Sequence, residues 1–165
     1  MRNGREIRKH GTQSGYSFPE LLIVVAIIGM FVLFGGPALN SAVKSYRVRS
    51  AANGLANDLR AQRYLAVSNR GSRSVTINRQ DHSTAPNQYT FVNPQGRSVT
   101  VRLDLVTVDT ASATSVPFNM NGSTGTAGNI NVVLSNDITA TRGERYTVTV
   151  TPTGTVQTAF ATYVP

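Results

Sequence analysis

Residues 15–39 read GYSFPELLIVVAIIGMFVLFGGPAL, and this stretch decides the N-terminal architecture of the chain. Leu21–Leu39 is a run of 19 residues without a charged side chain. A helix rises about 1.5 Å per residue, so a run of this length covers most of a hydrocarbon core about 30 Å thick. The sequence therefore predicts a hydrophobic transmembrane or filament-core helix over residues 16–39.

The residues before this helix are basic. They hold four cations and one acid, which are Arg2, Arg5, Arg8, Lys9 and Glu6. Basic residues before an apolar run keep that end in the cytoplasm, so the rest of the chain is expected outside. A secretory signal peptide would place its small cleavage residue after the apolar run, whereas Gly15 precedes it. Small residues at 35, 36 and 38 leave a conventional signal peptide as the alternative.

Glu20 is a carboxylate at the edge of the apolar run. An acid within a membrane helix costs on the order of 2.5–3.5 kcal/mol, so a plain anchor has no use for it. Cleavage after Gly15 would create a free amine at Tyr16, one helical turn from Glu20. Glu20 could neutralise the amine of its own chain or of a neighbouring subunit. Because a buried charge pair tolerates poor geometry badly, such a pair could set the axial register between subunits.

The run from Gly15 to Gly29 resembles the class III signal of type IV prepilins and of type II secretion pseudopilins. The match comprises the cleavage glycine, an aromatic residue after it, the glutamate and the long aliphatic run; Pro37 also stands where pilins usually carry a helix-distorting proline. The resemblance implies cleavage between Gly15 and Tyr16 by a membrane prepilin peptidase, with N-methylation of Tyr16. Pro19 departs from the isoleucine of many pilins, but proline is tolerated in a first helical turn.

What the resemblance implies for assembly follows from the same residues. The expected partners are other pilins or pseudopilins, an inner-membrane assembly platform and the lipid bilayer. The expected assembly residues are Glu20, Leu21, Leu22 and Pro37. The chain would be a single-pass inner-membrane protein first, and then part of a periplasmic pseudopilus or an extracellular pilus.

Residues 40–70 continue as an amphipathic stem helix. One apolar stripe recurs at spacings of three, four or seven residues: Val48, Ala52, Leu55, Leu59 and Ala66. We expect a local break at Gly35-Gly36-Pro37, because proline removes a backbone hydrogen bond and glycine resists helix. Asn69-Arg70-Gly71 is expected to end the helix, with Gly71 able to take the left-handed cap conformation.

From residue 71 to 165 the pattern changes to alternation, which predicts a β-rich head. Six or seven short strands are expected, near residues 74–78, 89–92, 98–105, 116–118, 130–134, 146–150 and 156–160. The turn Asn93–Gly96 joins two of them into a hairpin whose one face carries Val99, Val101, Leu103 and Leu105. The predicted fold class is α+β, with a long N-terminal helix packed on a mainly antiparallel β-sheet head. The chain is thus expected to divide into a leader (1–15), a hydrophobic transmembrane or filament-core helix (16–39), an amphipathic stem helix (40–70) and a β-rich head (71–165).

Further segments of the stem and head resemble one particular group of pilin-like proteins. The stretch Leu59–Gly71, followed by Ser74–Ile77, resembles the junction of helix and first strand in the GspH/FimT group of pseudopilins and minor pilins. Phe118–Gly122 and Thr151–Val156 resemble the closing pattern of that domain. The group often has arginine after the final glycine, whereas this chain has Thr155 after Gly154.

We expect no enzyme, metal site or cofactor. Asp81-His82-Ser83 holds the residue types of a hydrolase triad, but consecutive side chains point different ways and cannot share one proton path. The chain has two histidines and no cysteine, which excludes a histidine cluster and a thiolate metal site within one chain. The glycine-rich run 122–128 lacks the lysine of a phosphate-binding loop and is expected to be a flexible loop.

The basic surplus leaves DNA as an alternative partner. Four of the 16 basic residues and one of the eight acids precede Tyr16, leaving 12 and 7 after cleavage. A basic patch can bind DNA through its phosphates, and some FimT-type minor pilins take part in DNA uptake. The candidate contacts are Arg60, Arg63, Arg70 and Arg73. The tail 159–165 contains no basic residue, which speaks against this function. An abundant major pilin is a further alternative, since major and minor subunits share the same signal.

Overall fold

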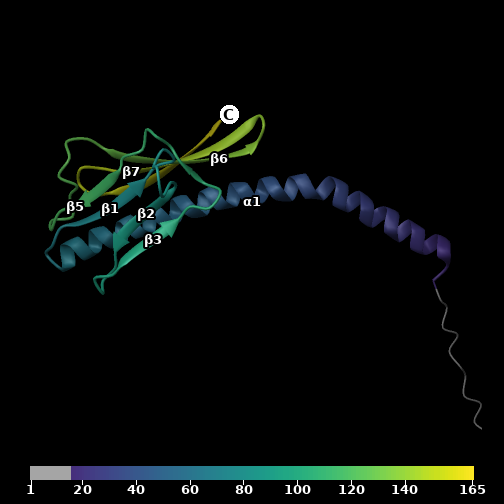
Figure 1. Ribbon diagram of the computed structural model, residues 1–165, viewed down its shortest axis with the longest axis horizontal. Helices are drawn as coiled ribbons and strands as arrows, with labels where there is room; N and C mark the ends of the chain where they lie inside the picture. The colour runs from purple at the N-terminus through teal and green to yellow at the C-terminus, as the bar shows by residue number, and fades with distance from the viewer. Residues whose placement is uncertain (1–15) are drawn as a thin grey trace, which may run out of the picture. The chain divides into compact units, whose positions relative to one another are not determined.

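The computed structural model describes residues 16–165, except for the side chains of residues 32–35 and 37 (Figure 1). The predicted leader 1–15, with Gly15, and the side chain of Pro37 lie outside the described set. The chain divides into two compact units, Met1–Ala38 and Leu39–Pro165.

Helix α1 runs from Phe18 to Ser68. Ser17 precedes it as the N-cap residue, and its carbonyl accepts hydrogen bonds from the amides of Glu20 and Leu21 at 3.0 and 3.2 Å. Pro19 lies in this first turn, where its missing N–H leaves no helical hydrogen bond unmade. Among the described residues, no helix contains a stretch long and apolar enough to cross a membrane.

The expected interruption at residues 35–37 is wrong, because the helical assignment of α1 continues through them. A proline removes one hydrogen bond and can bend a helix without ending it. Once a helix is nucleated on both sides, restarting it costs more than the one lost bond.

The C-terminal end of α1 is a Schellman motif. The amide of Gly71 donates to the carbonyl of Ala66 at 3.1 Å, and the amide of Arg70 donates to the carbonyl of Val67 at 3.4 Å. These are the two bonds of that motif. The left-handed residue is Arg70, with φ of 48°, and not Gly71 as expected. The helix stops one residue earlier than the glycine position suggested, so the strained conformation falls on a side chain that disfavours it.

Eight strands follow within the described chain, and they form two sheets. Their bounds are β1 (Arg73–Asn78), β2 (Gln88–Val92), β3 (Ser98–Arg102), β4 (Thr107–Val108), β5 (Ser115–Phe118), β6 (Ile130–Thr139), β7 (Arg142–Val150) and β8 (Val156–Tyr163). The first sheet has the order β3-β2-β1-β5 and the second β4-β6-β7-β8. All pairs are antiparallel, as expected. The two-residue strand β4 is too short to give an alternating pattern, and it was not predicted.

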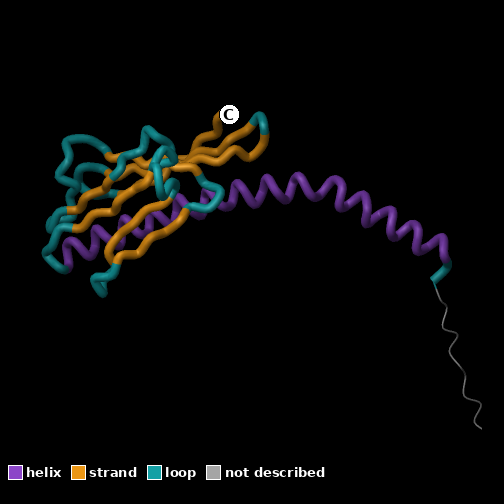
Figure 2. Tube along the Cα trace, viewed as in Figure 1, coloured by secondary structure: helices purple, strands orange, loops and turns teal. Residues whose placement is uncertain are grey.

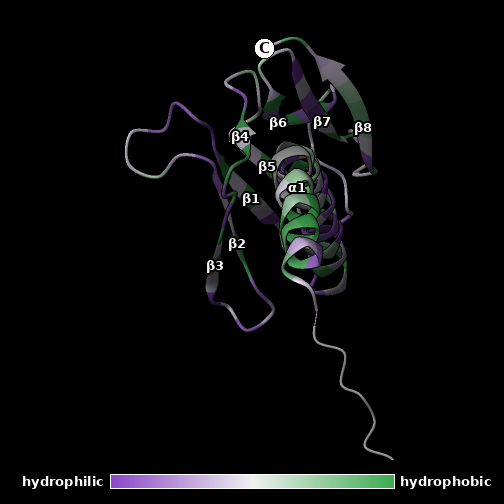
Figure 3. Ribbon diagram, turned by 90° about the vertical axis from the view of Figure 1, so that its right-hand side faces the viewer, coloured by the Kyte–Doolittle hydropathy of each residue, from purple (hydrophilic) through white to green (hydrophobic). Residues whose placement is uncertain are grey.

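Both sheets pack on the second half of α1 (Figures 2 and 3). The predicted stripe on the stem is buried from end to end, with no member more than 1 % exposed. It meets apolar side chains of the first sheet, such as Val75 and Phe118, and of the second, such as Leu134 and Val148. The core is therefore one helix stripe shared between two sheets rather than the single sheet that the sequence predicted.

The β2–β3 hairpin has the predicted turn, closed by the amide of Asn93 donating to the carbonyl of Arg97 at 2.9 Å. The predicted face is correct up to Leu103, which is buried. Leu105 departs from it, because β3 ends at Arg102 and Leu105 lies in a turn with φ of 61°. Its side chain is 64 % exposed.

Replacing Arg70 by glycine is expected to stabilise the head. Glycine adopts the left-handed conformation without the Cβ penalty, so the free energy of unfolding of the full chain should rise by about 1 kcal/mol. Denaturant unfolding followed by circular dichroism measures the change. Arg70→Ala is the matched control, because it removes the same side chain and keeps Cβ. Equal stability of the two variants would contradict strain at this position.

Candidate assembly site

The first part of α1 exposes apolar side chains on every side. From Leu21 to Phe31, nine large side chains are between 48 and 75 % exposed: Leu21, Leu22, Ile23, Val24, Val25, Ile27, Ile28, Met30 and Phe31. Several turns of the ribbon of α1 toward the viewer in Figure 3 have the colour of hydrophobic residues. A helix that is apolar all round is normally a buried helix. The described residues 16–165 leave this surface without a cover.

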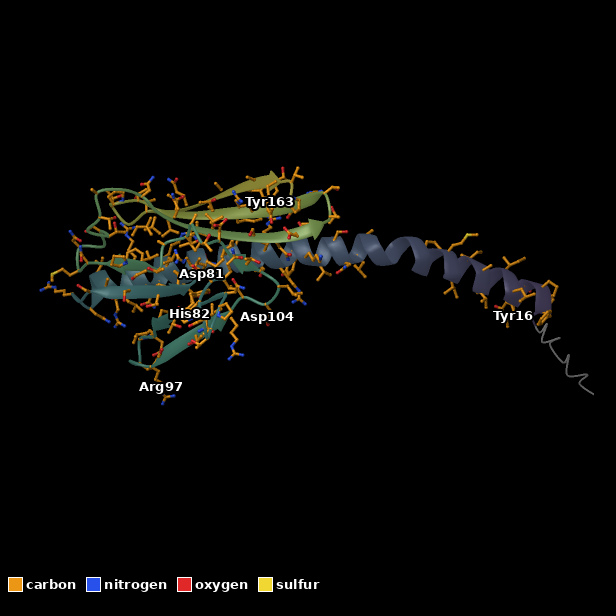
Figure 4. All side chains as sticks on the ribbon, turned by 45° about the horizontal axis from the view of Figure 1, so that its top comes forward. Tyr16, Asp81, His82, Arg97, Asp104 and Tyr163 are labelled. Carbon is orange, nitrogen blue, oxygen red and sulfur yellow. The ribbon has the colours of Figure 1, made fainter. Side chains whose placement is uncertain are left out.

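Glu20 lies in the first turn of α1 and is exposed. Acids in this position are favoured by the positive end of the helix dipole. Ser17 and Glu20 also have the Ser-x-x-Glu spacing of a capping box, a local signal that sequence reasoning missed. Tyr16, at the start of the described chain in Figure 4, is 84 % exposed. Neither Tyr16 nor Glu20 has an ion pair among residues 16–165, so the amine–carboxylate contact stays a prediction.

Three of the four candidate DNA-contact arginines donate to carbonyls of the head. The guanidinium of Arg60 donates to the carbonyl of Val156 at 3.2 Å, and that of Arg73 to Val92 at 3.3 Å. Arg63 donates twice, to Gly122 at 3.1 Å and to Thr153 at 3.2 Å. Arg70 is exposed, and its guanidinium makes no hydrogen bond or ion pair within residues 16–165. These three arginines thus serve the fold first, and among the four candidates only Arg70 has a guanidinium with no partner in residues 16–165.

Arg63 joins loops that belong to different sheets. Gly122 follows β5 of the first sheet, and Thr153 lies in the turn between β7 and β8 of the second. The loops also bond directly, since the amide of Thr124 donates to the carbonyl of Pro152 at 3.0 Å. A Cβ at Gly154 would lie 1.9 Å from the carbonyl oxygen of Gly122, so only glycine fits there. We call this contact of Arg63, Gly122 and the 151–154 turn the Arg63 clamp.

The start of the glycine-rich run 122–128 is anchored at this clamp, whereas residues 125–128 are exposed, so the flexibility expected of this loop stays a prediction. Thr124 is 3 % exposed and its hydroxyl lies 2.8 Å from that of Thr126. Gly122 and Gly125 both have positive φ, of 79° and 69°. The glycines serve a tight packed path of the backbone, a use that composition alone does not distinguish from flexibility.

A shallow groove lies beside the clamp, between the C-terminal part of α1 and the start of β8. Its volume is about 350 Å³. It is lined by Arg60, Arg63, Tyr64, Val67, Gly154, Thr155 and Val156. Tyr64 is 72 % exposed, which places an aromatic face next to two cations.

Two further links between helix and strands carry polar groups that the sequence did not single out. The hydroxyl of Ser45 donates to Glu144 of β7 at 2.5 Å, and Glu144 is 3 % exposed. The hydroxyl of Tyr89 in β2 donates to Asp58 of α1 at 2.6 Å. Burial and the Asp58 carboxylate raise the pKa of Tyr89 well above its ordinary value, so this phenol stays a donor throughout the neutral range.

The triad-like residues do not form a catalytic set. Asp81 pairs with Arg79 at 3.1 Å, and Nδ1 of His82 accepts from the amide of Ala85 at 3.3 Å. Both lie in the turn region after β1, as labelled in Figure 4. In the described part of the chain, no three side chains of His, Cys, Asp or Glu gather closely enough to hold a metal ion.

Loss of the Arg63 guanidinium is expected to loosen the head. Arg63→Ala removes two charge-assisted hydrogen bonds and should lower the free energy of unfolding by about 2 kcal/mol. Denaturant unfolding of the full chain measures the change, with Arg70→Ala as the control, which should change it by less than about 0.5 kcal/mol. If both variants unfold alike, the clamp does not stabilise the fold.

Comparison with known proteins agrees with this architecture at the level of fold. No protein-family model matches the chain, and no curated protein matches it in sequence. The chain is similar in structure to the type IV minor pilin FimU of Pseudomonas aeruginosa strain PAO1, with a TM-score of 0.52 and 17 % sequence identity. The similarity covers 70 % of this chain and 90 % of FimU. The chain therefore has a pilin-like α+β fold.

Proposed function

We propose that this chain is a structural subunit, a GspH/FimT-type pilin or pseudopilin, that assembles into a filament through α1. The observation that carries the proposal is the all-round apolar surface of residues 21–31 on the helix whose later turns organise a folded head. Packing such helices against one another removes that surface from water at about 25 cal/mol per Å². The pilin-like fold of the head supports the same role.

The steps before assembly are part of the proposal and rest on the sequence. A prepilin peptidase cuts between Gly15 and Tyr16 and methylates the new amine. The chain is first held in the inner membrane by the uncharged run Leu21–Leu39, with its basic end in the cytoplasm. The assembly platform then transfers it into a type IV pilus or a type II secretion pseudopilus.

In the assembled filament, Glu20 is proposed to neutralise the Tyr16 amine of a neighbouring subunit. Its first-turn position and its exposure leave the carboxylate available to another chain. An apolar surface alone does not define an axial position, because aliphatic side chains slide past one another at small cost. A charge pair surrounded by apolar side chains has one favourable geometry, so it fixes the register. Leu21 and Leu22 next to it, and Pro37 further on, complete the proposed contact surface.

Glu20→Ala is expected to leave cleavage largely intact and to reduce incorporation into filaments by at least about tenfold, since one partner of a buried pair is lost. The measurement is quantitative mass spectrometry of sheared surface filaments and of the inner membrane, including the N-terminal peptide. A peptide that starts at methylated Tyr16 reports the cut. Its abundance in filaments separates a major from a minor pilin, and its retention in the membrane fraction indicates a pseudopilin.

Asp104→Ala is the matched control for Glu20→Ala, because Asp104 is an exposed acid in the turn after β3 of the head, distant in sequence from the first turn of α1 (Figure 4). It should leave incorporation unchanged. Normal incorporation of the Glu20 variant would remove the register role, whereas an intact Met1 terminus in wild-type filaments would overturn the whole proposal.

DNA binding is a second candidate, favoured by one feature. The groove beside the clamp places exposed Tyr64 next to Arg60 and Arg63, the combination on which single-stranded nucleic acid stacks. Against it stands the use of both guanidinium groups by backbone carbonyls.

This second function predicts that the full chain in detergent retards a single-stranded oligonucleotide at low salt. The double variant Arg60→Ala, Tyr64→Ala should weaken binding at least about tenfold, because stacking on one aromatic side chain is worth about 1–3 kcal/mol. Arg97→Ala, in the β2–β3 turn, is the control that removes one exposed cation elsewhere (Figure 4). No retardation at low salt would end this candidate.

A further inference from the structure

The outer edges of the two sheets differ in how they are protected. Edge strands expose unpaired backbone groups, and proteins usually shield them by shortness, charge or proline. Edge β4 has two residues, β5 contains Pro117, and β3 has five residues ending in Arg102. Edge β8 has eight residues, VQTAFATY, without a charge, a proline or a glycine. Residues 157–162 of β8 are all exposed. It is the one long, unshielded edge in the described chain.

The hydrogen-bond pattern of the β7–β8 hairpin tells which groups of β8 point away from the sheet. The amide of Thr151 donates to the carbonyl of Thr155 at 3.0 Å, so this pair is a bonded one. Bonded and non-bonded pairs alternate along an antiparallel ladder. The register Val148↔Thr158, Tyr146↔Phe160 and Glu144↔Thr162 therefore consists of non-bonded pairs. The N–H and C=O groups of Thr158, Phe160 and Thr162 point outward.

These three residues are the first, third and fifth of a five-residue segment whose sequence reads the same in both directions. Residues 158–162 are Thr-Ala-Phe-Ala-Thr, with Phe160 at the centre. Two copies placed antiparallel about Phe160 would bring Thr158 opposite Thr162 of the second copy, and each Phe160 opposite the other. The backbone N–H and C=O groups of Thr158, Phe160 and Thr162 then point at those of the second copy. The threonine and phenylalanine pairs are therefore hydrogen-bonded pairs. The two alanine pairs fall at the closer, non-bonded spacing of about 4.5 Å between Cα atoms, which small side chains suit.

We propose that β8 is a docking edge for β8 of a second copy of this chain. The contact is isologous and joins the two four-stranded second sheets into one, with a twofold axis at Phe160. Phe160 is 53 % exposed beside Tyr146, at 5.0 Å between ring centroids, and would gain an aromatic contact across the axis.

Electrostatics permits this contact although the chain is basic. The net charge of +8 makes two copies repel at most faces. Opposite Ala161 and Thr162 of β8 lie Arg145 and Glu144 of β7, and each is already compensated. Arg145 lies 3.8 Å from Asp109 and over the ring of Tyr163, and Glu144 pairs with Arg142 at 2.8 Å. Arg60 of α1 meets β8 only at its first residue, through the carbonyl of Val156. The uncharged edge is therefore a place where two copies meet without like-charge contact.

This pairing is independent of the filament role. A twofold axis at β8 sets the second half of α1 in the two copies on the same face of the joined sheet and running in opposite directions. Neighbours in one filament would run in the same direction, so the β8 contact fits free subunits or subunits of two adjacent filaments. Failure of β8 pairing would thus leave filament assembly through α1 untouched.

The chain has no cysteine, so register can be tested by crosslinking. Ala159→Cys and Ala161→Cys are made in the full chain in detergent, each with a different tag, and oxidised alone and as a mixture. Ala159 lies opposite Ala161 of the second copy, within disulfide reach, whereas like positions are diagonal and too far apart. The mixture should form crosslinked heterodimer at least about fivefold faster than either variant forms homodimer.

A second pair of variants tests the backbone contact without cysteine. Thr158→Pro removes an outward N–H that makes no bond to β7, so the monomer should keep its fold while dimer is lost in sedimentation. Thr158→Ala keeps that N–H and should keep the dimer. Equal crosslinking rates in mixed and single samples, or a wild-type chain that stays monomeric at high concentration with both variants folded, would overturn the proposal. A faster rate in the single-variant samples would assign a different register and overturn it as well.

Discussion

The apolar surface of α1 is the constraint on which the rest of the structure depends. Over its second half that surface is a stripe, and two sheets cover it so completely that Val48, Ala52 and Leu59 are fully buried. Over its first half the surface is all round, and the described side chains from Leu21 to Phe31 stay exposed. The second half of the helix is thus completed by its own chain, whereas the described residues leave the first half exposed, and burial of apolar area is the dominant favourable term by which such a surface is stabilised.

The two sheets that pack on this helix have no strand in common, so other contacts must hold them together. The Arg63 clamp does this with polar groups at the end of the helix. The arginine comes from α1, Gly122 from the end of the first sheet and Thr153 from the second. The close approach at Gly154, where a Cβ would meet the Gly122 carbonyl, shows that the loops are in direct backbone contact. Tyr89 with Asp58 and Ser45 with Glu144 tie one sheet each to the same helix.

Sequence reasoning succeeded where the pattern is local and failed where partners are distant. The stripe of α1 and seven of the eight strands follow from spacing, since each residue's burial is fixed by its neighbours at three, four or two positions. Sequence reasoning missed three features: the uninterrupted helix at 35–37, the left-handed Arg70 and the exposed Leu105. Each depends on where a helix or strand begins or ends, and hydrophobic periodicity locates such ends poorly. The division into two sheets and the partners of Arg60, Arg63 and Arg73 depend on residues up to 96 positions away, beyond any periodicity.

The positive charge of the chain is also interpreted differently once the distant partners of its arginines are known. A surplus of arginine suggests a polyanion when only composition is known. Here Arg60, Arg63 and Arg73 each donate to backbone carbonyls, which are acceptors that any loop offers and that no count of acids records. A guanidinium held in this way keeps its charge but loses the free fork that a phosphate would need for a bidentate contact. These three arginines therefore serve first to tie α1 to the head and β1 to β2, and fewer guanidinium groups are left free for a polyanion than the composition suggests.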